Sequence, residues 1–404
     1  MKTNVGVFFG GRSVEHEISV LSALQAINAF DKDKYEVVPI YITKEGRWFT
    51  GDALLDIDNY KDMKALEKKA EEVFMKPVFG DFNLYKAKSG IFSKGNPVAA
   101  TLHVVIPIVH GTNCEDGIFE GVLETIGIPF AGCNTLSSAV GMDKIMMKMI
   151  LRSDSIPVVD FVWTTDKRWG HDRDAVIAEV ESKLSYPVIV KPANLGSSVG
   201  IGRADNREQL IAKVNEAEKF SDRIIIEKCV EQLQEINCSV LGDAEECRAS
   251  ILEEPIKSGE ILSYTDKYMG GSKTEGRGMA ASDKRIPADL PTDVTERIRQ
   301  MAMDTFKALA CHGVSRVDVM IDKADGNIYV NEINTIPGSL SYYLWEASGI
   351  PFSQLMDRLV KLAYKRKRET DRKTFSNDIN IFTMKGGVKG GIKVGTKSLK
   401  GVKN

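Results

Sequence analysis

The sequence contains no apolar run long enough to cross a membrane. Its longest runs, such as Val104 to Val109, fall far short of the roughly 20 residues that a transmembrane helix needs. The first residues show no secretory signal pattern, because they lead directly into a short strand-like stretch and a glycine loop. A net charge of -2 gives no reason to expect a nucleic-acid or membrane partner. We therefore expect a cytoplasmic protein without a membrane span.

Paired cysteines and a Walker A loop are also missing. The six cysteines include no C-x-x-C pair, which argues against a zinc site and a thioredoxin-like site, and we interpret them as reduced, buried thiols. No G-x-x-x-x-G-K-[ST] segment occurs. What is present is an ordinary globular composition over 404 residues, a length that suits two or three domains.

Alternating strands and helices dominate the first third of the chain. An apolar run from Val5 to Phe9 ends in two glycines, and apolar residues then recur at helical spacing from Val20 to Ile27. Further strand candidates lie at Val37 to Ile42 and Leu102 to Val109. Such alternation predicts parallel βαβ units, so residues 1–133 are expected to form a parallel-sheet α/β domain.

Two lobes that mix strands and helices are expected next, a central lobe over residues 134–222 and a C-terminal lobe over residues 223–370. The central lobe is predicted to hold a helix from Ser138 to Arg152 and strands at Val158 to Trp163 and Val188 to Lys191. The C-terminal lobe is predicted to hold strands at Ile224 to Val230, Ile236 to Leu241 and Arg248 to Glu253, and a helix from Asp293 to Leu309.

The end of the chain is basic and rich in glycine. From Lys365 to Asn404, 12 lysines and arginines accompany three acidic residues, so this stretch carries +9. The repeat KGGVKGGIKVGTK has a glycine density that opposes a helix. We predict a flexible, solvated tail over residues 371–404, with weak attraction to an anionic surface or RNA as the alternative.

The most informative segment is a predicted hairpin, Gly313 to Ile321 and Ile328 to Asn334, which turns at an Asp-Gly pair. Because side chains alternate along a strand, Arg316 and Asp318 share one face of their strand, and Glu332 and Asn334 likewise share a face of theirs. The turn position places Asp318 across from residues 332–334. Carboxylate and amide oxygens are ligands that Mg²⁺ prefers. A surface ion-pair ladder neutralised by Arg316 is the alternative.

A second informative segment runs from Val188 to Gly200. Its strand ends at Lys191, and the following loop, ANLGSSVG, offers backbone N–H groups and two serine hydroxyls that suit phosphate oxygens. A Gly-Ser-Ser turn alone is a weak signal. Together with a lysine at the strand end and the acidic hairpin, it predicts that nucleotide phosphates lie between lysines and metal ions.

Two further loops follow strands, where open α/β sheets bind ligands. One precedes a helix whose first turn carries Glu15, and the other begins at His110. For Glu15 the alternative is a favourable interaction with the helix N-terminus. For His110 the alternative is a histidine that is hydrogen-bonded at the end of a strand.

Seven motifs occur in order: GGRSVEHEIS, HGTNCEDG, GMDK, KPANLGSSVG, SYTDKY, SRVDVM and NEINTIPGS. Jointly they resemble the D-alanine:D-alanine ligase family of the ATP-grasp superfamily, with its D-Ala:D-Ser and D-Ala:D-Lac relatives, over residues 3–362. The resemblance implies an α/β domain followed by a two-lobed (α+β) ATP-grasp fold. It implies that ATP, with two Mg²⁺ ions or Mn²⁺, activates one D-alanine carboxylate as an acyl phosphate for attack by a second D-alanine. A homodimer that serves peptidoglycan synthesis is expected.

The resemblance also assigns roles to matching positions. Catalytic roles fall on Glu15, Ser197, Tyr268, Arg316 and Gly338. ATP contacts fall on Lys144, Lys191, Ser198, Glu227, Lys228, Val230, Glu235 and Lys267. Substrate contacts fall on His110, Glu115, Ser339 and Tyr343, and the metal ligands would be Asp318, Glu332 and Asn334. Lys267 and Tyr268 correspond to a mobile loop that closes the site.

Three positions depart from the family pattern. Cys114 stands where glycine is usual, and the stretch from Cys229 to Glu235 is one residue longer. Tyr343 stands where a serine helps to form the second subsite. The acceptor could therefore be D-alanine or another D-amino or D-hydroxy acid, such as D-serine or D-lactate. More distant alternatives are a biotin-carboxylase-like or carbamoyl-phosphate-like enzyme, which Glu15 and the SYTDKY loop oppose, and an ATP-binding protein without catalysis.

Overall fold

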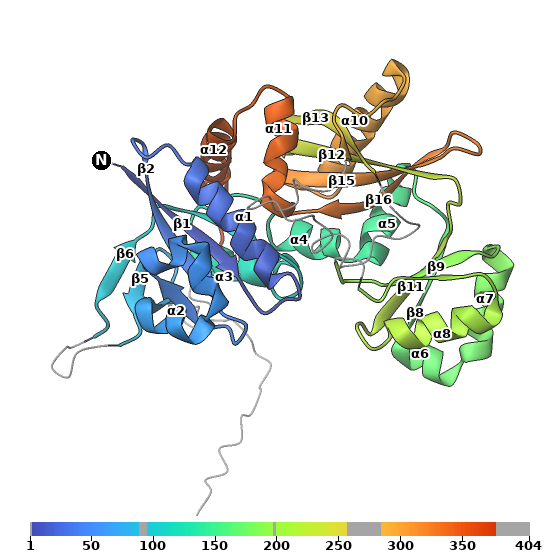
Figure 1. The fold of residues 1–404 in the computed structure, drawn as a ribbon, viewed down its shortest axis with the longest axis horizontal. Helices are drawn as coiled ribbons and strands as arrows, with labels where there is room; N and C mark the ends of the chain where they lie inside the picture. Colours follow the sequence, from blue (N-terminus) through green and yellow to red (C-terminus); the bar gives the residue numbers. More distant parts are fainter. Residues whose placement is uncertain (1, 89–94, 197–198, 257–283, 377–404) are drawn as a thin grey trace, which may run out of the picture. The chain divides into compact units, whose positions relative to one another are not determined.

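Three β-sheets organise the part of the chain that the computed structural model describes, residues 2–88, 95–196, 199–256 and 284–376. Figure 1 shows these sheets with their helices. Met1–Lys367 forms one unit and Arg368–Asn404 a second. Across the described ranges, no helix has the length and apolar character needed to cross a membrane. Most of the predicted basic tail, from position 377 onward, lies outside the described residues.

The first sheet has seven strands in the order β6-β5-β4-β3-β2-β1-β7. They are β1 (Thr3–Gly10), β2 (Tyr35–Ile42), β3 (Trp48–Thr50), β4 (Glu71–Met75), β5 (Asn83–Lys86), β6 (Val98–Thr101) and β7 (Val104–Val109). β1 runs parallel to β2 and β7, which confirms the predicted parallel core. The remaining strands, absent from the prediction, extend it in antiparallel order. The associated helices are α1 (His16–Ala29), η1 (Asp52–Leu55), η2 (Ile57–Lys61), α2 (Met63–Lys69) and α3 (Ile118–Ile126).

The second sheet has the order β10-β9-β11-β8. Its strands are β8 (Phe161–Thr165), β9 (Val188–Pro192), β10 (Gly202–Ala204) and β11 (Arg223–Lys228), and Figure 1 shows α6 (Asp166–His171), α7 (Arg173–Lys183) and α8 (Arg207–Ala217) beside it. β11 pairs with β8 and β9, so its predicted place in the C-terminal lobe was wrong. A short apolar strand such as β11 fits a buried position in either sheet, and sequence alone does not choose between them.

The third sheet has the order β14-β13-β12-β15-β16. Its strands are β12 (Leu233–Gly242), β13 (Cys247–Pro255), β14 (Lys284–Arg285), β15 (Gly313–Asp322) and β16 (Ile328–Asn334), followed by η4 (Gly338–Ser341), α11 (Tyr342–Ala347) and α12 (Phe352–Thr370). α10 (Thr292–Ala308) buries Ile298, Ala302 and Phe306 in the core of this sheet, the four-residue spacing of one helix face. The predicted hairpin of β15 and β16 is confirmed.

Two helices replace the single helix predicted from Ser138 to Arg152. They are α4 (Thr135–Met142) and α5 (Lys144–Ser153). Asp143 lies between them in an extended conformation, and its carboxylate accepts hydrogen bonds from the backbone N–H groups of Ile145 and Met146 in the first turn of α5. Aspartate is a favoured N-cap residue, so the continuous helix was wrong. The break places Lys144 in the first turn of α5.

Candidate active site

The β15–β16 hairpin brings two carboxylates and an amide together. Asp318 pairs with Glu332 across the strands, and Arg316 pairs with Asn334, as alternation and the turn position predicted. Arg316 donates to both carboxylate oxygens of Asp318, at 2.6 and 2.8 Å, and Asn334 Nδ2 donates to Asp318 at 3.1 Å. Among the described residues, no three His, Cys, Asp or Glu side chains form a metal-binding group.

A β-bulge beside this cluster redirects Asn331. The register shifts after Asp318, which pairs with Glu332, so that Asn331 is the extra residue on β16. A bulge interrupts the regular alternation of side chains. The Asn331 amide oxygen accepts a hydrogen bond from Lys191 Nζ at 3.1 Å. Asn331 was not predicted as a site residue, because nothing in the sequence marks this bulge.

Three buried charges meet where α5, β9 and β11 approach one another. The Glu227 carboxylate, on β11, lies 2.8 Å from Lys148 Nζ and 2.6 Å from Lys191 Nζ. Burial disfavours ionisation of Glu227, but the two ammonium groups outweigh it and lower the pKa of Glu227 to about 2. Burial opposes the charge of Lys191, yet Glu227 raises the pKa of Lys191 above its ordinary value. One carboxylate therefore holds two cations.

Lys144 and Lys148 are four residues apart on α5, the spacing of one helix face. Lys144 is buried, donates to the backbone oxygen of Leu195 at 3.0 Å and lies 3.4 Å from the Glu332 carboxylate. Lys144 and Lys191 thus both contact the hairpin. Lys148 was missed by the sequence analysis, although its spacing from Lys144 was an available signal.

Glu15 precedes α1, and its carboxylate lies against two glycine loops. A Cβ on Gly196 would lie 3.2 Å from each carboxylate oxygen of Glu15, and a Cβ on Gly111 would lie 2.9 Å from one of them. Gly111 has a φ of +76°, a conformation that favours glycine. The two glycines therefore let both loops approach Glu15. Ser197, which directly follows Gly196, lies outside the described residues.

The HGTNCEDG loop is tied to the chain after β16. Glu115 accepts hydrogen bonds from the backbone N–H of Ile336 at 2.9 Å and of Gly111 at 3.3 Å. Burial, followed by the charge of Glu15, raises the pKa of Glu115 to about 8. Cys114 is buried in this loop, and burial raises the pKa of its thiol to about 12. Glu115 is therefore a buried link between two walls of the site.

A strained turn joins the hairpin to α11. Residues Ser339 to Ser341 all have φ between 50° and 53°, a left-handed conformation that costs about 1–2 kcal/mol per residue. Ser22 Oγ on α1 accepts a hydrogen bond from the Ser339 N–H at 2.9 Å and lies 3.1 Å from His110 Nε2. Burial lowers the pKa of His110 to about 4. A neutral His110 and Ser22 thus support the turn that begins at Gly338.

The remaining predicted residues are of two kinds, those that the structure describes and those that lie outside the described residues. Lys228 at the end of β11 is exposed, and Val230 in the segment that follows packs against Val159 and Met320. The charge of Glu235 on β12 contributes to the raised pKa of Lys191. Tyr343 on α11 is half-buried and donates to Glu253 at 2.7 Å. Ser198, Lys267 and Tyr268 lie outside the described residues, as Ser197 does.

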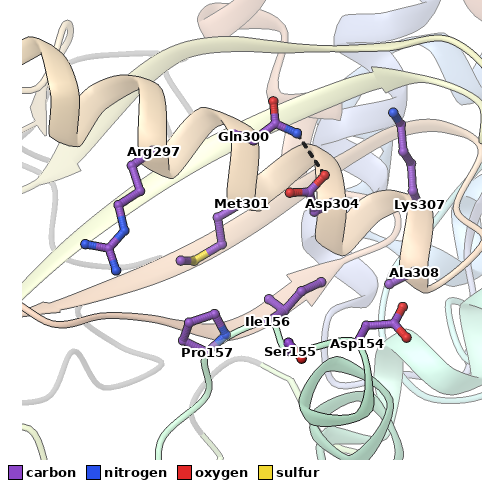
Figure 2. A pocket seen from close by; sticks show the side chains of 10 residues that line it. All are labelled: Asp154, Ser155, Ile156, Pro157, Arg297, Gln300, Met301, Asp304, Lys307 and Ala308. Carbon is purple, nitrogen blue, oxygen red and sulfur yellow. Dashed lines mark hydrogen bonds between the residues drawn. The ribbon is translucent and has the colours of Figure 1, made fainter.

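A separate hollow lies away from these residues. Figure 2 shows its lining side chains, on α10 and on the 154–157 turn that follows α5. Its volume is about 750 Å³. Gln300 donates to Asp304 within it at 2.8 Å, and its lining includes none of the predicted site residues. An active site is identified by convergent reactive groups as well as by a cavity, so we locate the candidate site at the β15–β16 hairpin.

The two antiparallel sheets, with lysines near one and an acidic hairpin on the other, define the fold as that of an ATP-grasp ligase. The D-alanine-D-alanine ligase of Coxiella burnetii has this fold with a TM-score of 0.76 and 31% identity, over 92% of this chain and 96% of that chain. The VanG D-Ala:D-Ser ligase of Enterococcus faecalis has a TM-score of 0.75 and 29% identity, over 90% of this chain and 100% of that chain.

Sequence comparisons lead to the same group. The pattern described as D-ala D-ala ligase N-terminus matches residues 4–133, and that described as D-ala D-ala ligase C-terminus matches residues 150–361. The D-alanine--D-alanine ligase of Thermosipho melanesiensis is 40% identical over 384 residues, 95% of this chain and 99% of the relative. The chain belongs to the D-alanine–D-alanine ligase family, a family of ATP-dependent ligases. The resemblance seen in the motifs is confirmed.

Proposed function

We propose that the chain joins two D-alanine molecules into D-alanyl-D-alanine for peptidoglycan precursor synthesis. ATP would phosphorylate the carboxylate of the first D-alanine, and the amine of the second would attack the acyl phosphate. The observation that carries this proposal is the contact of Lys144 with Glu332 and of Lys191 with Asn331. These contacts bring two lysine ammonium groups to the hairpin that carries the carboxylates. Phosphoryl transfer needs both kinds of group.

Asp318, Glu332 and Asn334 would hold two Mg²⁺ ions, or Mn²⁺. The oxygen atoms of these side chains suit magnesium ions, because Mg²⁺ prefers one or two carboxylates together with substrate phosphates. The same carboxylates already attract cations, since Arg316 binds Asp318 and Lys144 lies 3.4 Å from Glu332. When bound, the ions would offset negative charge on the transferring phosphoryl group.

The nucleotide would lie between the second and third sheets. Lys144, Lys191, Ser198 and Lys267 would bind its phosphates, with adenine near Glu227, Lys228 and Val230 and ribose at Glu235. The Glu227 carboxylate is engaged by Lys148 and Lys191. Its main contribution is therefore to fix those lysines, which leaves the backbone of β11 for the base.

The first D-alanine would bind with its ammonium group at Glu15, beside Ser197 and Tyr268. Arg316 and the backbone at Gly338 would stabilise the tetrahedral centre, where preorganised donors act on developing negative charge. His110, Glu115 and Ser339 line or support this side of the pocket, and Tyr343 lines the acceptor side. The hydrogen bonds of His110 and Glu115 support the role of these two residues in holding the pocket walls.

Phosphate release with ATP, Mg²⁺ and D-alanine tests the proposal, with products identified by mass. Formation of D-alanyl-D-alanine together with phosphate would support it. ATP binding without phosphate release, for D-alanine and for every other D-amino acid offered, would instead indicate an ATP-binding protein without ligase activity.

A second candidate function keeps D-alanine as the first substrate and changes the acceptor. Tyr343 favours this second function, because its ring stands where the family places a serine. One structural relative is also named a D-Ala:D-Ser ligase. Addition of D-serine or D-lactate to the D-alanine assay decides between the two. A mixed product that outweighs D-alanyl-D-alanine would establish this second function.

We also propose that the chain forms a homodimer in the cytoplasm. Ile118 and Val122 on α3 and Leu136 on α4 are exposed apolar side chains, the kind of surface that marks protein contacts. A monomer mass in analytical ultracentrifugation at assay concentration would contradict the dimer.

The domain limits at residues 133, 222 and 370 stay predictions, although β11 extends the second sheet to Lys228.

A further inference from the structure

A cluster of charged and aromatic side chains adjoins Arg316 on the side of β13 and β14. The Tyr343 hydroxyl donates to Glu253 at 2.7 Å, and Lys284 Nζ lies 3.5 Å from the centre of the Tyr343 ring. Burial opposes the charge of Arg316, but Asp318, followed by Tyr343 and Glu253, raises the pKa of Arg316, so this cluster lies within electrostatic reach of Arg316. The proposed reaction gives no role to Glu253 or Lys284.

The Lys284 ammonium group is buried without a hydrogen-bond acceptor. Its Nζ is shielded from solvent and has no hydrogen-bond partner in the described part of the chain. The nearby carboxylate of Glu253 already accepts a hydrogen bond from the Tyr343 hydroxyl. An unsatisfied buried donor is costly, and more so when it is charged. Native proteins rarely keep such a group without a reason.

A carboxylate ligand would remove this cost. An ammonium group offers three donors and no acceptor, so its matching ligand is an anion. Burial lowers the pKa of Lys284, Glu253 raises it and Arg316 lowers it, which shows that Lys284 lies within electrostatic reach of the proposed reaction centre. The ring of Tyr343 below the ammonium contributes a cation–π contact that holds it in place.

We propose that Lys284 binds the carboxylate of the acceptor substrate, a small α-amino acid. Tyr343 and Glu253 position the ammonium group of Lys284 for this contact. The inference rests on the proposed ligase function. In an α-amino acid the amine and the carboxylate share one carbon. A carboxylate held at Lys284 therefore directs the amine toward Arg316, where positioning of the two reactants accelerates attack. The Tyr343 ring closes the pocket and restricts the acceptor to a small side chain.

The test compares D-alanine with D-alaninamide, which lacks the carboxylate, as acceptors for a D-alanine donor. Products are separated by mass and kcat/KM is determined for each acceptor. In Lys284→Met, kcat/KM for D-alanine should fall about 10- to 100-fold, the effect of one charge-assisted hydrogen bond. The value for D-alaninamide should change little. Lys284→Arg, which keeps the charge, should recover part of the D-alanine value.

Arg285→Met is the matched control, since it removes the adjacent positive charge from a half-exposed side chain that pairs with Glu254. It should leave both acceptors unchanged. An unchanged D-alanine value in Lys284→Met, with an active wild type, would overturn the inference. A wild type that releases no phosphate would overturn the proposed function instead. If Lys284→Met fails to fold, the wild type still tests the inference. Equal kcat/KM values of the wild type for D-alanine and D-alaninamide would show that the acceptor carboxylate is not bound.

Discussion

The carboxylate of Glu227 lies 2.6 Å from the ammonium group of Lys191, and both side chains are buried. Lys148 shares the same carboxylate, so two buried positive charges face one buried negative charge. Excess charge in the protein interior is costly unless a partner balances it. The triphosphate of ATP would supply that balance at the hairpin, to which Lys191 is bound through Asn331.

The buried charges should be important for stability. Glu227→Gln would remove the carboxylate that contacts both Lys148 and Lys191, and loss of one partner from a buried pair typically destabilises a protein by about 3–5 kcal/mol. Chemical denaturation of the variant should show a loss of this order. Glu216→Gln, which breaks the exposed pair with Lys213, should cost less than about 1 kcal/mol. Equal effects of the two substitutions would contradict the arrangement described.

The raised pKa of Glu115 predicts a pH dependence of stability. A carboxyl group whose folded pKa is about 8, above its ordinary value, contributes stability that is fully present below the ordinary pKa and is lost as the pH rises through 8. Glu115→Gln keeps an acceptor for the Ile336 N–H and removes this titration. Wild type should therefore lose roughly 2–5 kcal/mol relative to the variant between pH 5 and pH 9. Parallel curves of melting temperature against pH would refute the prediction.

Ser22 should matter for catalysis without contacting the nucleotide. In Ser22→Ala, the Ser339 N–H loses its acceptor, which leaves a buried donor unsatisfied at a cost of about 1–3 kcal/mol. The strained turn after the hairpin should relax, so kcat should fall while KM for ATP stays near its wild-type value. Ser182→Ala is the control, because Ser182 is exposed and bonds only to Glu179 within the described residues. A variant with wild-type kcat would show that the turn does not depend on Ser22.

The basic tail should be dispensable for the reaction. Removal of residues 371–404 takes away lysines and glycines but none of the predicted site residues. Phosphate release by the truncated chain should remain close to that of the full chain, measured at the same protein concentration. An inactive truncated protein that still melts cooperatively would show that the tail belongs to the catalytic machinery.

Much of the site geometry follows from local sequence pattern. The facing positions of Asp318 and Glu332 were predicted because strand alternation and an Asp-Gly turn determine the register of a hairpin. The bulge at Asn331 was not predicted, because a register shift depends on packing between strands. The N-cap at Asp143 could have been predicted from its residue type just before a helical segment, and the continuous apolar periodicity concealed it.

Long-range pairing was the main limit of sequence reasoning. β11 was assigned to the wrong sheet, since its apolar side chains fit either core. Lys148 was missed because a lysine in an amphipathic helix is usually solvated. Its spacing from Lys144 places the two on one helix face, but its contact with Glu227 depends on tertiary structure. His110 gave no local sign of whether it would line the pocket or support its wall. The structure provides the hydrogen bond to Ser22 that favours support.

The most direct test of the account is ATP turnover by Glu332→Ala with D-alanine and Mg²⁺. Glu332 pairs with Asp318 across the hairpin and contacts Lys144, so its removal should abolish phosphate release while Glu346→Ala, an exposed change on α11, preserves it. Both variants should melt near the wild-type temperature. Turnover by Glu332→Ala at the wild-type rate would contradict the claim that this hairpin holds the metal ions and the reacting phosphoryl group.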